Sequence, residues 1–217
     1  MDRSLISGRL LAGEGRRMTE KQRRIVTAAA LLFAEQGFAA TSTRQIAQKA
    51  QVSDGAIFRH FAGKKELLTY ISQLIISNVV TPLFNEGLAG LFERHYNRPE
   101  DFLQAFFAGR LELVEENILL LKLLLQEAMF QPEIRQAFLL TVRQSQFLLL
   151  IAGLKERGLP TVIPYQELAM LILSTLVGFI FSHYLITPEI LPPDHRQQQE
   201  SHIRRLTFSL AWVWQKK

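Results

Sequence analysis

Apolar residues recur at intervals of three and four along most of the chain, and almost no segment shows the alternation of a β-strand, so the sequence predicts a succession of helices. A first helix is expected to begin after Thr19, which can form a capping box with Gln22, and to end at Gly37. A second capping box, Ser42 with Gln45, predicts the start of another, shorter helix.

A turn-sized interruption at residues 51–53 separates this short helix from the next one, which Ser53 is expected to cap. Two short helices joined by a tight turn form a helix-turn-helix. With the first helix they would share a small core, composed of Ile25, Leu32, Phe33, Ile46, Val52, Ile57 and Phe61. A domain of about 50 residues buries little apolar surface, so we expect it to pack against the C-terminal part of the chain.

The periodicity continues beyond residue 63 and predicts an all-α fold of about nine or ten helices. Pro82 and Pro132 are expected to end helices, and Pro99 to start one. The predicted ranges are 64–81, 83–96, 97–113, 118–130, 133–157, 164–187 and 196–215.

Positive charge is concentrated at the N-terminal end of the chain. Residues 1–70 hold 12 Lys or Arg against 6 Asp or Glu, whereas residues 71–217 hold 13 against 14, so the net charge of +5 arises in the first third. Such a local positive field attracts a phosphate backbone and also an anionic membrane surface. The helix-turn-helix favours nucleic acid over the membrane.

The second helix of the motif is about two turns long, so burying Ile57 and Phe61 leaves its other face free for a major groove. Taken singly, exposed cations are more often solubilising charges, and only the combination points to DNA. The residues that we predict to contact DNA are Ser42, Thr43, Arg44, Ser53, Asp54, Gly55, Ala56, Phe58, Arg59, His60, Lys64 and Lys65.

Different members of this set are expected to do different things. Gly55 and Ala56 have little or no side chain, which would let the backbone approach base edges and thymine methyl groups. Lys64 and Lys65 are the first residues of the next helix, where free backbone N–H groups already favour an anion. We therefore expect both lysines to bind phosphate. His60 is either a phosphate contact or a packed surface histidine.

The stretch from Thr19 to Leu68 resembles the DNA-binding domain of the TetR/AcrR family of one-component transcriptional regulators. The residues that match its recognition-helix pattern are Val52, Ser53, Gly55, Ile57, His60, Phe61 and Lys64. The sequence departs from the pattern at Gln51, where the family usually has Gly, and at Phe58, where it usually has Tyr. The first departure implies a non-glycine at positive φ, at a cost of about 1 kcal/mol. The second removes a hydroxyl that commonly touches phosphate in relatives.

The resemblance implies a flexible arm over residues 1–17, a DNA-binding domain over 18–65 and an effector-binding and dimerisation domain over 66–217. It also implies a cytoplasmic repressor that binds a palindromic operator of double-stranded DNA as a homodimer and is released by a small apolar or amphipathic effector. The last two helices would form the dimer interface, with Leu206, Phe208 and Trp212 on it. The effector would lie against Phe102, Phe106, Phe107, Arg110, Phe130, Phe138, Phe147 and His183, although phenylalanines at helical spacing are more often plain core.

Residues 168–186 contain no Asp, Glu, Lys or Arg and approach the length of a membrane span, so a membrane-associated helical protein with a basic surface domain is the alternative. Ser174 and Thr175 inside this run, and the lack of flanking cationic clusters, favour burial at a dimer interface instead. The first 17 residues support no signal peptide, because Arg9 interrupts their apolar run.

We expect no enzyme activity. Cys is absent, which excludes disulfides, thiol catalysis and cysteine-bound metals. Adjacent carboxylates such as Glu115 and Glu116 point in different directions on a helix, and the spacing of His195 and His202 matches no metalloenzyme signature. No catalytic residue, cofactor or metal site is predicted.

Overall fold

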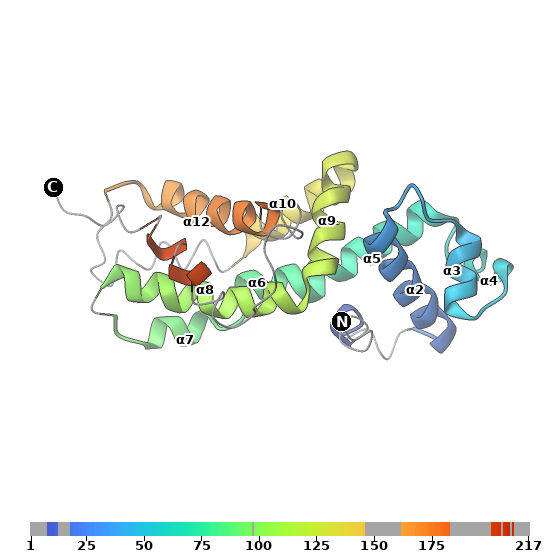
Figure 1. Ribbon diagram of the computed structural model, residues 1–217, viewed down its shortest axis with the longest axis horizontal. Helices are drawn as coiled ribbons and strands as arrows, with labels where there is room; N and C mark the ends of the chain where they lie inside the picture. The colour runs from blue at the N-terminus through green and yellow to red at the C-terminus, as the bar shows by residue number, and fades with distance from the viewer. Residues whose placement is uncertain are drawn as a thin grey trace. The chain divides into compact units, whose positions relative to one another are not determined.

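The computed structural model describes residues 8–12, 18–96, 98–145, 162–182, 201–204, 206–208 and 210. These residues form helices joined by turns and loops, with no strand among them (Figure 1). The all-α prediction is therefore confirmed. The chain divides into two compact units. Unit 1 contains residues 1–82 and 116–141, and unit 2 contains residues 83–115 and 142–217.

Unit 1 begins with the three predicted helices, α2 (Glu20–Gln36), α3 (Thr43–Ala50) and α4 (Asp54–Phe58). Both capping boxes are present. The Gln22 N–H donates to Thr19 Oγ1 at 3.3 Å, and the Thr19 N–H donates to Gln22 Oε1 at 2.8 Å. Gly37 ends α2 with a φ of 86°, a conformation that favours glycine. The sequence rule therefore placed these helix ends correctly.

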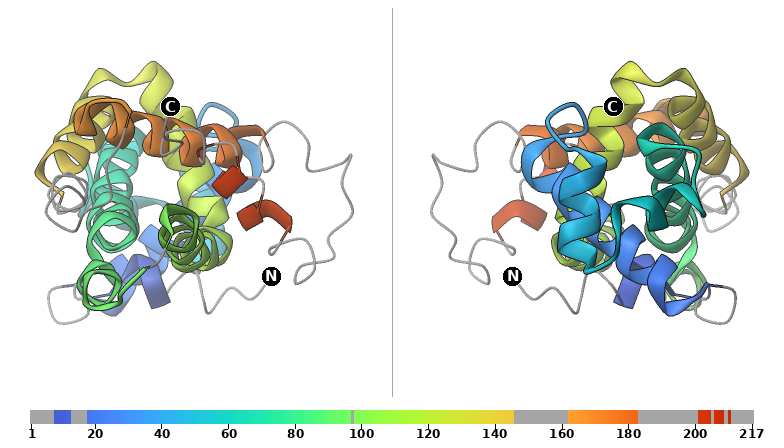
Figure 2. Two further views of the ribbon diagram at one scale, coloured as in Figure 1. Left: turned by 90° about the vertical axis from the view of Figure 1, so that its left-hand side faces the viewer. Right: turned by 90° about the vertical axis from the view of Figure 1, so that its right-hand side faces the viewer.

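The shared core of the three helices matches the prediction closely. Its fully buried members are Ile25, Phe33, Ile46 and Ile57, and Phe61 is 7% exposed. Leu32 and Val52 are only half-buried, so they sit at the edge of this core. The right-hand view of Figure 2 shows α3 and α4 at the end of the unit that faces the viewer.

The next helical segment is longer than predicted. α5 (Lys64–Ile75) continues through a π-helical turn, η1 (Ile76–Val80), into α6 (Thr81–Asn85). The predicted end at Pro82 was wrong, because proline is tolerated in the first turn of a helix, where its missing N–H is not needed. The preceding π turn lets the Thr81 N–H reach the carbonyl of Ile76, and the Thr81 hydroxyl donates to the same carbonyl at 2.9 Å.

Two segments distant in sequence complete unit 1. α9 (Ile118–Phe130) lies at the residues predicted for it and packs against α2 and α5 (Figure 1). Residues 8–10 form a helical turn where a flexible arm was expected; Leu10 is fully buried, and its carbonyl accepts a hydrogen bond from Asn78 Nδ2 at 2.9 Å. The helix-turn-helix therefore rests on further elements of the chain, as its small core requires.

Unit 2 contains α7 (Leu88–Glu93), most of α8 (Pro99–Glu116) and α12 (Tyr165–Ile180), and α10 (Pro132–Gln144) begins in unit 1 and ends in unit 2. Pro99 starts α8 as predicted. Among the described residues, one helical segment is long and apolar enough to span a membrane, at 64–85, with a mean hydropathy of 1.5. Of its most apolar window, 61% is buried within the protein, as in a core helix.

Candidate nucleic-acid interface

The turn between α3 and α4 is held by backbone hydrogen bonds and one unusual conformation. Gln51 has φ 55° and ψ 47°, the only positive φ of a non-glycine residue in the described part of the chain. This conformation brings the Val52 N–H to the carbonyl of Ala47 at 3.0 Å, which closes the end of α3. The turn fixes the direction in which α4 leaves α3.

α4 exposes one face and buries the other. Asp54, Gly55 and Arg59 are exposed, and the Phe58 ring is 57% exposed although it is large and apolar. The exposed face of this five-residue helix thus presents an aromatic ring as well as polar groups. Ser53 is exposed at the N-cap position as predicted, but its hydroxyl makes no capping hydrogen bond.

Ala56 does not belong to this exposed face. Its side chain is only 6% exposed, because it lies on the side of α4 that carries Ile57 into the core. The Ala56 side chain is therefore turned into the protein, and the predicted approach of the backbone at this position to base edges stays a prediction. The neighbouring Gly55 is left as the small residue of the exposed face, and a Cβ atom added to it would meet no other atom within 4 Å.

The beginning of α3 presents a second group of the predicted residues. Ser42 and Arg44 are exposed, and Thr43 is half-buried. The Ser42 hydroxyl accepts from the Gln45 N–H at 3.2 Å, and the Ser42 N–H donates to Gln45 Oε1 at 2.7 Å. This capping box holds the first turn of α3, so Arg44 projects from an ordered helix start.

Lys64 does not project from the surface as expected. Its ammonium group donates to the carbonyls of Phe38 and Thr41, each at 2.7 Å, and to that of Ala39 at 3.4 Å. It also lies 4.3 Å from the centre of the Phe38 ring. The charge is therefore directed at the connection between α2 and α3 in the free chain, and the predicted phosphate contact stays a prediction. Lys65, the next residue, is exposed.

A carboxylate on α9 faces the charge of Lys64. Partial burial raises the pKa of Glu127, while a hydrogen bond from Gln131 and the positive charge of Lys64 lower it. The amide Nε2 of Gln131 lies 3.5 Å from Glu127 Oε2. The pKa of Glu127 is raised overall, because burial destabilises the charged carboxylate more than Gln131 and Lys64 stabilise it.

His60 is half-buried and lines a cavity of about 400 Å³ beside the start of α2. Its walls also include Met18, Gln22, Phe61 and Tyr70. The packed surface histidine, one of the two alternatives that the sequence left open, describes this position. A phosphate contact from His60 stays a prediction.

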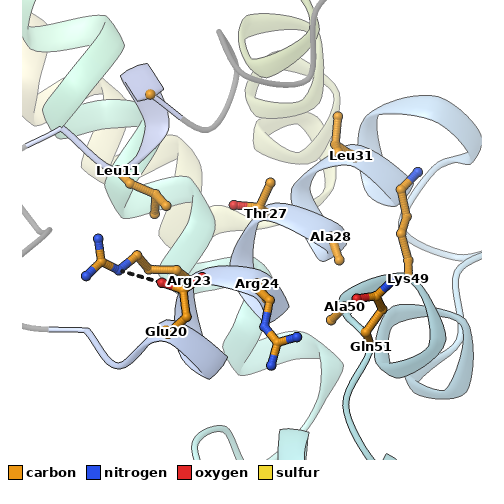
Figure 3. Close-up of a pocket in the computed structure, with 11 residues that line it drawn as sticks. Leu11, Glu20, Arg23, Arg24, Thr27, Ala28, Leu31, Lys49, Ala50 and Gln51 are labelled. Atoms are coloured by element: carbon orange, nitrogen blue, oxygen red, sulfur yellow. Dashed lines mark ion pairs between the residues drawn. The ribbon is translucent and has the colours of Figure 1, made fainter.

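A larger groove of about 600 Å³ lies along α2 (Figure 3). It runs from Leu11 to Gln51, and Arg23, Arg24 and Lys49 line it. Figure 3 shows these three side chains pointing in different directions. Arg23 pairs with Glu20 at 3.8 Å, and Lys49 pairs with Glu35 at 3.1 Å. The cations of this groove therefore do not converge on one anion.

Within unit 2, the structure brings together four of the residues predicted to bind an effector. Phe102, Phe106 and Phe107 are buried on α8, and Arg110 follows them at 5% exposure. The Arg110 Nη2 donates to the carbonyl of Glu86 at 2.8 Å, and its guanidinium lies 4.6 Å from the Phe106 ring centre. Burial lowers the pKa of Arg110 to about 10, although the charge of Glu86 acts against this shift.

The remaining residues predicted to bind the effector or to form the dimer interface differ in their exposure. Phe130, at the end of α9, is 80% exposed, so its predicted place in a cavity was wrong. Phe138 is half-buried on α10, and Phe147 and His183 lie outside the described residues. Of the predicted interface residues, Phe208 is 84% exposed, but Leu206 is buried within its own chain, and Trp212 lies outside the described residues.

Residues 25–71, which span the helix-turn-helix, match the model of the family described as "Bacterial regulatory proteins, tetR family". The N-terminal part of the chain is thus similar to the DNA-binding domain of TetR-family regulators. Members of this family are transcriptional regulators, which are generally not enzymes.

The chain is 32% identical over 125 residues to "Uncharacterized HTH-type transcriptional regulator YerO" of Bacillus subtilis, covering 56% of this chain and 41% of the relative. It is 39% identical over 74 residues to "HTH-type transcriptional repressor Rv3405c" of Mycobacterium tuberculosis, covering 34% of this chain and 39% of the relative. The chain thus spans about two fifths of the length of these curated relatives.

The fold is similar to solved TetR-family structures over most of its length. The regulator PfmR from Thermus thermophilus aligns with a TM-score of 0.64 at 23% identity, covering 89% of this chain and all of that one. A regulator of the family from Aquifex aeolicus aligns with a TM-score of 0.60 at 22% identity, covering 90% of this chain and 99% of that one. At these identities the likeness establishes the fold.

Proposed function

We propose that this chain regulates transcription by inserting α4 into the major groove of double-stranded DNA. The observation that carries the proposal is the exposed face of α4, with Gly55, Phe58 and Arg59, beside the exposed start of α3. A short helix fixed by a tight turn fits a major groove about 12 Å wide. Arg44, Arg59 and Lys65 are the cations placed to meet phosphates or base edges.

The family relation supports a homodimer on a palindromic operator. Two copies related by a two-fold axis would place their α4 helices about 34–36 Å apart, one turn of the duplex. Exposed apolar side chains in unit 2 support an interface there: Met170 is 59% exposed and Phe181 40%, and Phe208 adds to them. The dimer interface would therefore involve α12 and the last helix.

Release by a small effector completes the proposed mechanism, with the chain acting as a repressor in the cytoplasm. The aromatic cluster of Phe102, Phe106 and Phe107 offers apolar contacts, and Arg110 offers a polar one, which suits an apolar or amphipathic compound. Such a compound would prefer a conformation of the dimer whose two α4 helices are spaced wrongly for DNA.

A gel shift tests the DNA-binding proposal with the promoter region next to the chain's own gene. We expect the wild-type chain to retard this duplex, and Arg44→Ala and Arg59→Ala each to weaken binding by about 1–3 kcal/mol, which is about fivefold or more in Kd. Arg94→Ala is the matched control, because Arg94 is an exposed arginine outside unit 1. Equal affinities for all four proteins would refute the assigned interface.

A further inference from the structure

The ammonium group of Lys64 is surrounded by backbone carbonyls of its own chain. An ammonium nitrogen carries three N–H donors and no acceptor. Three backbone carbonyls lie within hydrogen-bonding distance of it, those of Phe38 and Thr41 at 2.7 Å and that of Ala39 at 3.4 Å. The Phe38 ring covers the group from a further side, at 4.3 Å. A DNA phosphate would have to displace one of these contacts.

The carbonyls that Lys64 holds belong to the connection from α2 to α3. The same connection is fixed from its other side by Thr41, which is 2% exposed and donates its hydroxyl to the carbonyl of Gly37 at 2.8 Å. Ser42 and Arg44 follow directly, at the exposed start of α3. The position of this connection therefore sets where the first turn of α3 meets DNA.

We infer that Lys64 is a positioning residue for DNA binding, and that it acts by tying the start of α5 to the α2–α3 connection rather than by contacting phosphate. This inference rests on the proposed function, and it assigns the two neighbouring lysines different roles. Lys65 is exposed and follows the same helix start, so it is the phosphate contact of the pair.

α9 supports this arrangement from outside the helix-turn-helix. α9 packs against both α2 and α5, the two elements that Lys64 connects. α9 therefore helps to fix the relative positions of α2 and α5, on which the contacts of Lys64 depend.

The salt dependence of DNA affinity separates the two roles. The probe is a fluorescein-labelled duplex that the wild-type chain enriches from a randomised pool, and the slope of log Kd against log salt concentration is measured by anisotropy. Each phosphate contact contributes about 0.9 to this slope. We expect Lys65→Met to lower the slope by about 0.9, and Lys64→Met to weaken binding about tenfold with the slope unchanged.

Lys64→Arg gives an independent comparison. A phosphate contact would survive this change, since arginine binds phosphate well. A planar guanidinium cannot direct three N–H groups at three carbonyls around one point, so we expect Lys64→Arg to bind nearly as weakly as Lys64→Met. Wild-type affinity in either Lys64 variant, or a slope lowered as in Lys65→Met, would overturn the inference.

A measurement on the unmodified chain covers the case in which the Lys64 variants do not fold. With lysine side chains labelled with ¹⁵N, we expect the ammonium protons of Lys64 to exchange slowly with water in the free protein, and its Nζ signal to stay in place when the duplex is added. The Lys65 signal should move on addition. Movement of the Lys64 signal with that of Lys65 would contradict the inference.

If the wild-type chain enriches no duplex, the proposed function fails, while slow exchange of the Lys64 ammonium protons would still show that this lysine is committed to the α2–α3 connection.

Discussion

At the scale of single residues, the turn of the helix-turn-helix depends on a glutamine in a conformation that suits glycine. Gln51 has φ 55° and ψ 47°, where a Cβ atom crowds the following carbonyl. The backbone N–H groups of Gln51 and Val52 both donate, to the carbonyls of Gln48 and Ala47. The strain is therefore local to one residue.

Gln51→Gly should relieve this strain. We expect the free energy of unfolding to rise by about 0.5–1 kcal/mol, because glycine adopts positive φ without steric cost. Gln48→Gly is the matched control, since Gln48 lies inside α3 and is also exposed. It should lower the free energy of unfolding by about 1 kcal/mol. Urea denaturation followed by circular dichroism measures both; a loss of stability in Gln51→Gly would contradict the explanation.

Lys64 shows what residue-level reasoning from the sequence could not supply. The sequence places it at a helix start, where a cation near an incoming phosphate is the ordinary interpretation. The three carbonyls that it contacts belong to residues 38–41, more than 20 positions earlier. Only the folded connection brings them together, so no local pattern could have identified these partners.

At the scale of elements, the two serines at N-cap positions differ in what their side chains do. The Ser42 hydroxyl caps α3, whereas that of Ser53 makes no capping hydrogen bond to α4. Ser42→Ala should therefore lower the free energy of unfolding by about 1 kcal/mol. Ser53→Ala should change it by much less. Denaturation curves of the two variants test this directly, and equal losses would show that the capping assignment is incorrect.

Helix boundaries were predictable wherever a local signal determines them. Capping boxes fixed the starts of α2 and α3, and α9 covers the residues predicted for it. The helix end predicted at Pro82 was wrong. A π turn precedes Pro82, and in the first turn of α6 the missing N–H of proline needs no partner, so the helical segment continues. The partners of α9 were not predictable, because periodicity shows that a helix has a buried face but does not identify what covers it.

At the scale of the whole molecule, the helix-turn-helix belongs to a unit that includes residues 116–141 as well as the N-terminal third of the chain. The prediction that a domain of about 50 residues needs support from elsewhere was therefore sound, and α9 supplies part of it. The boundary predicted at residue 65 stays a prediction about function, since compactness divides the chain differently.

The effector site was harder to predict from the sequence than the DNA-binding face. Three phenylalanines and Arg110 lie buried in unit 2 as predicted, but Phe130 is exposed. Apolar periodicity alone cannot distinguish core from cavity lining, and it cannot tell which end of a helix is left uncovered. The helix-turn-helix was easier because its function depends on local turns and caps.

The central claim is that two copies of the chain bind one DNA duplex together. Sedimentation velocity of the chain with the duplex that it enriches from the randomised pool tests this claim most directly. We predict two chains on each duplex, with binding that weakens steeply between about 50 and 200 mM salt, as expected for about six to ten phosphate contacts. A chain that stays monomeric at micromolar concentration and binds no duplex even in dilute buffer would contradict the account.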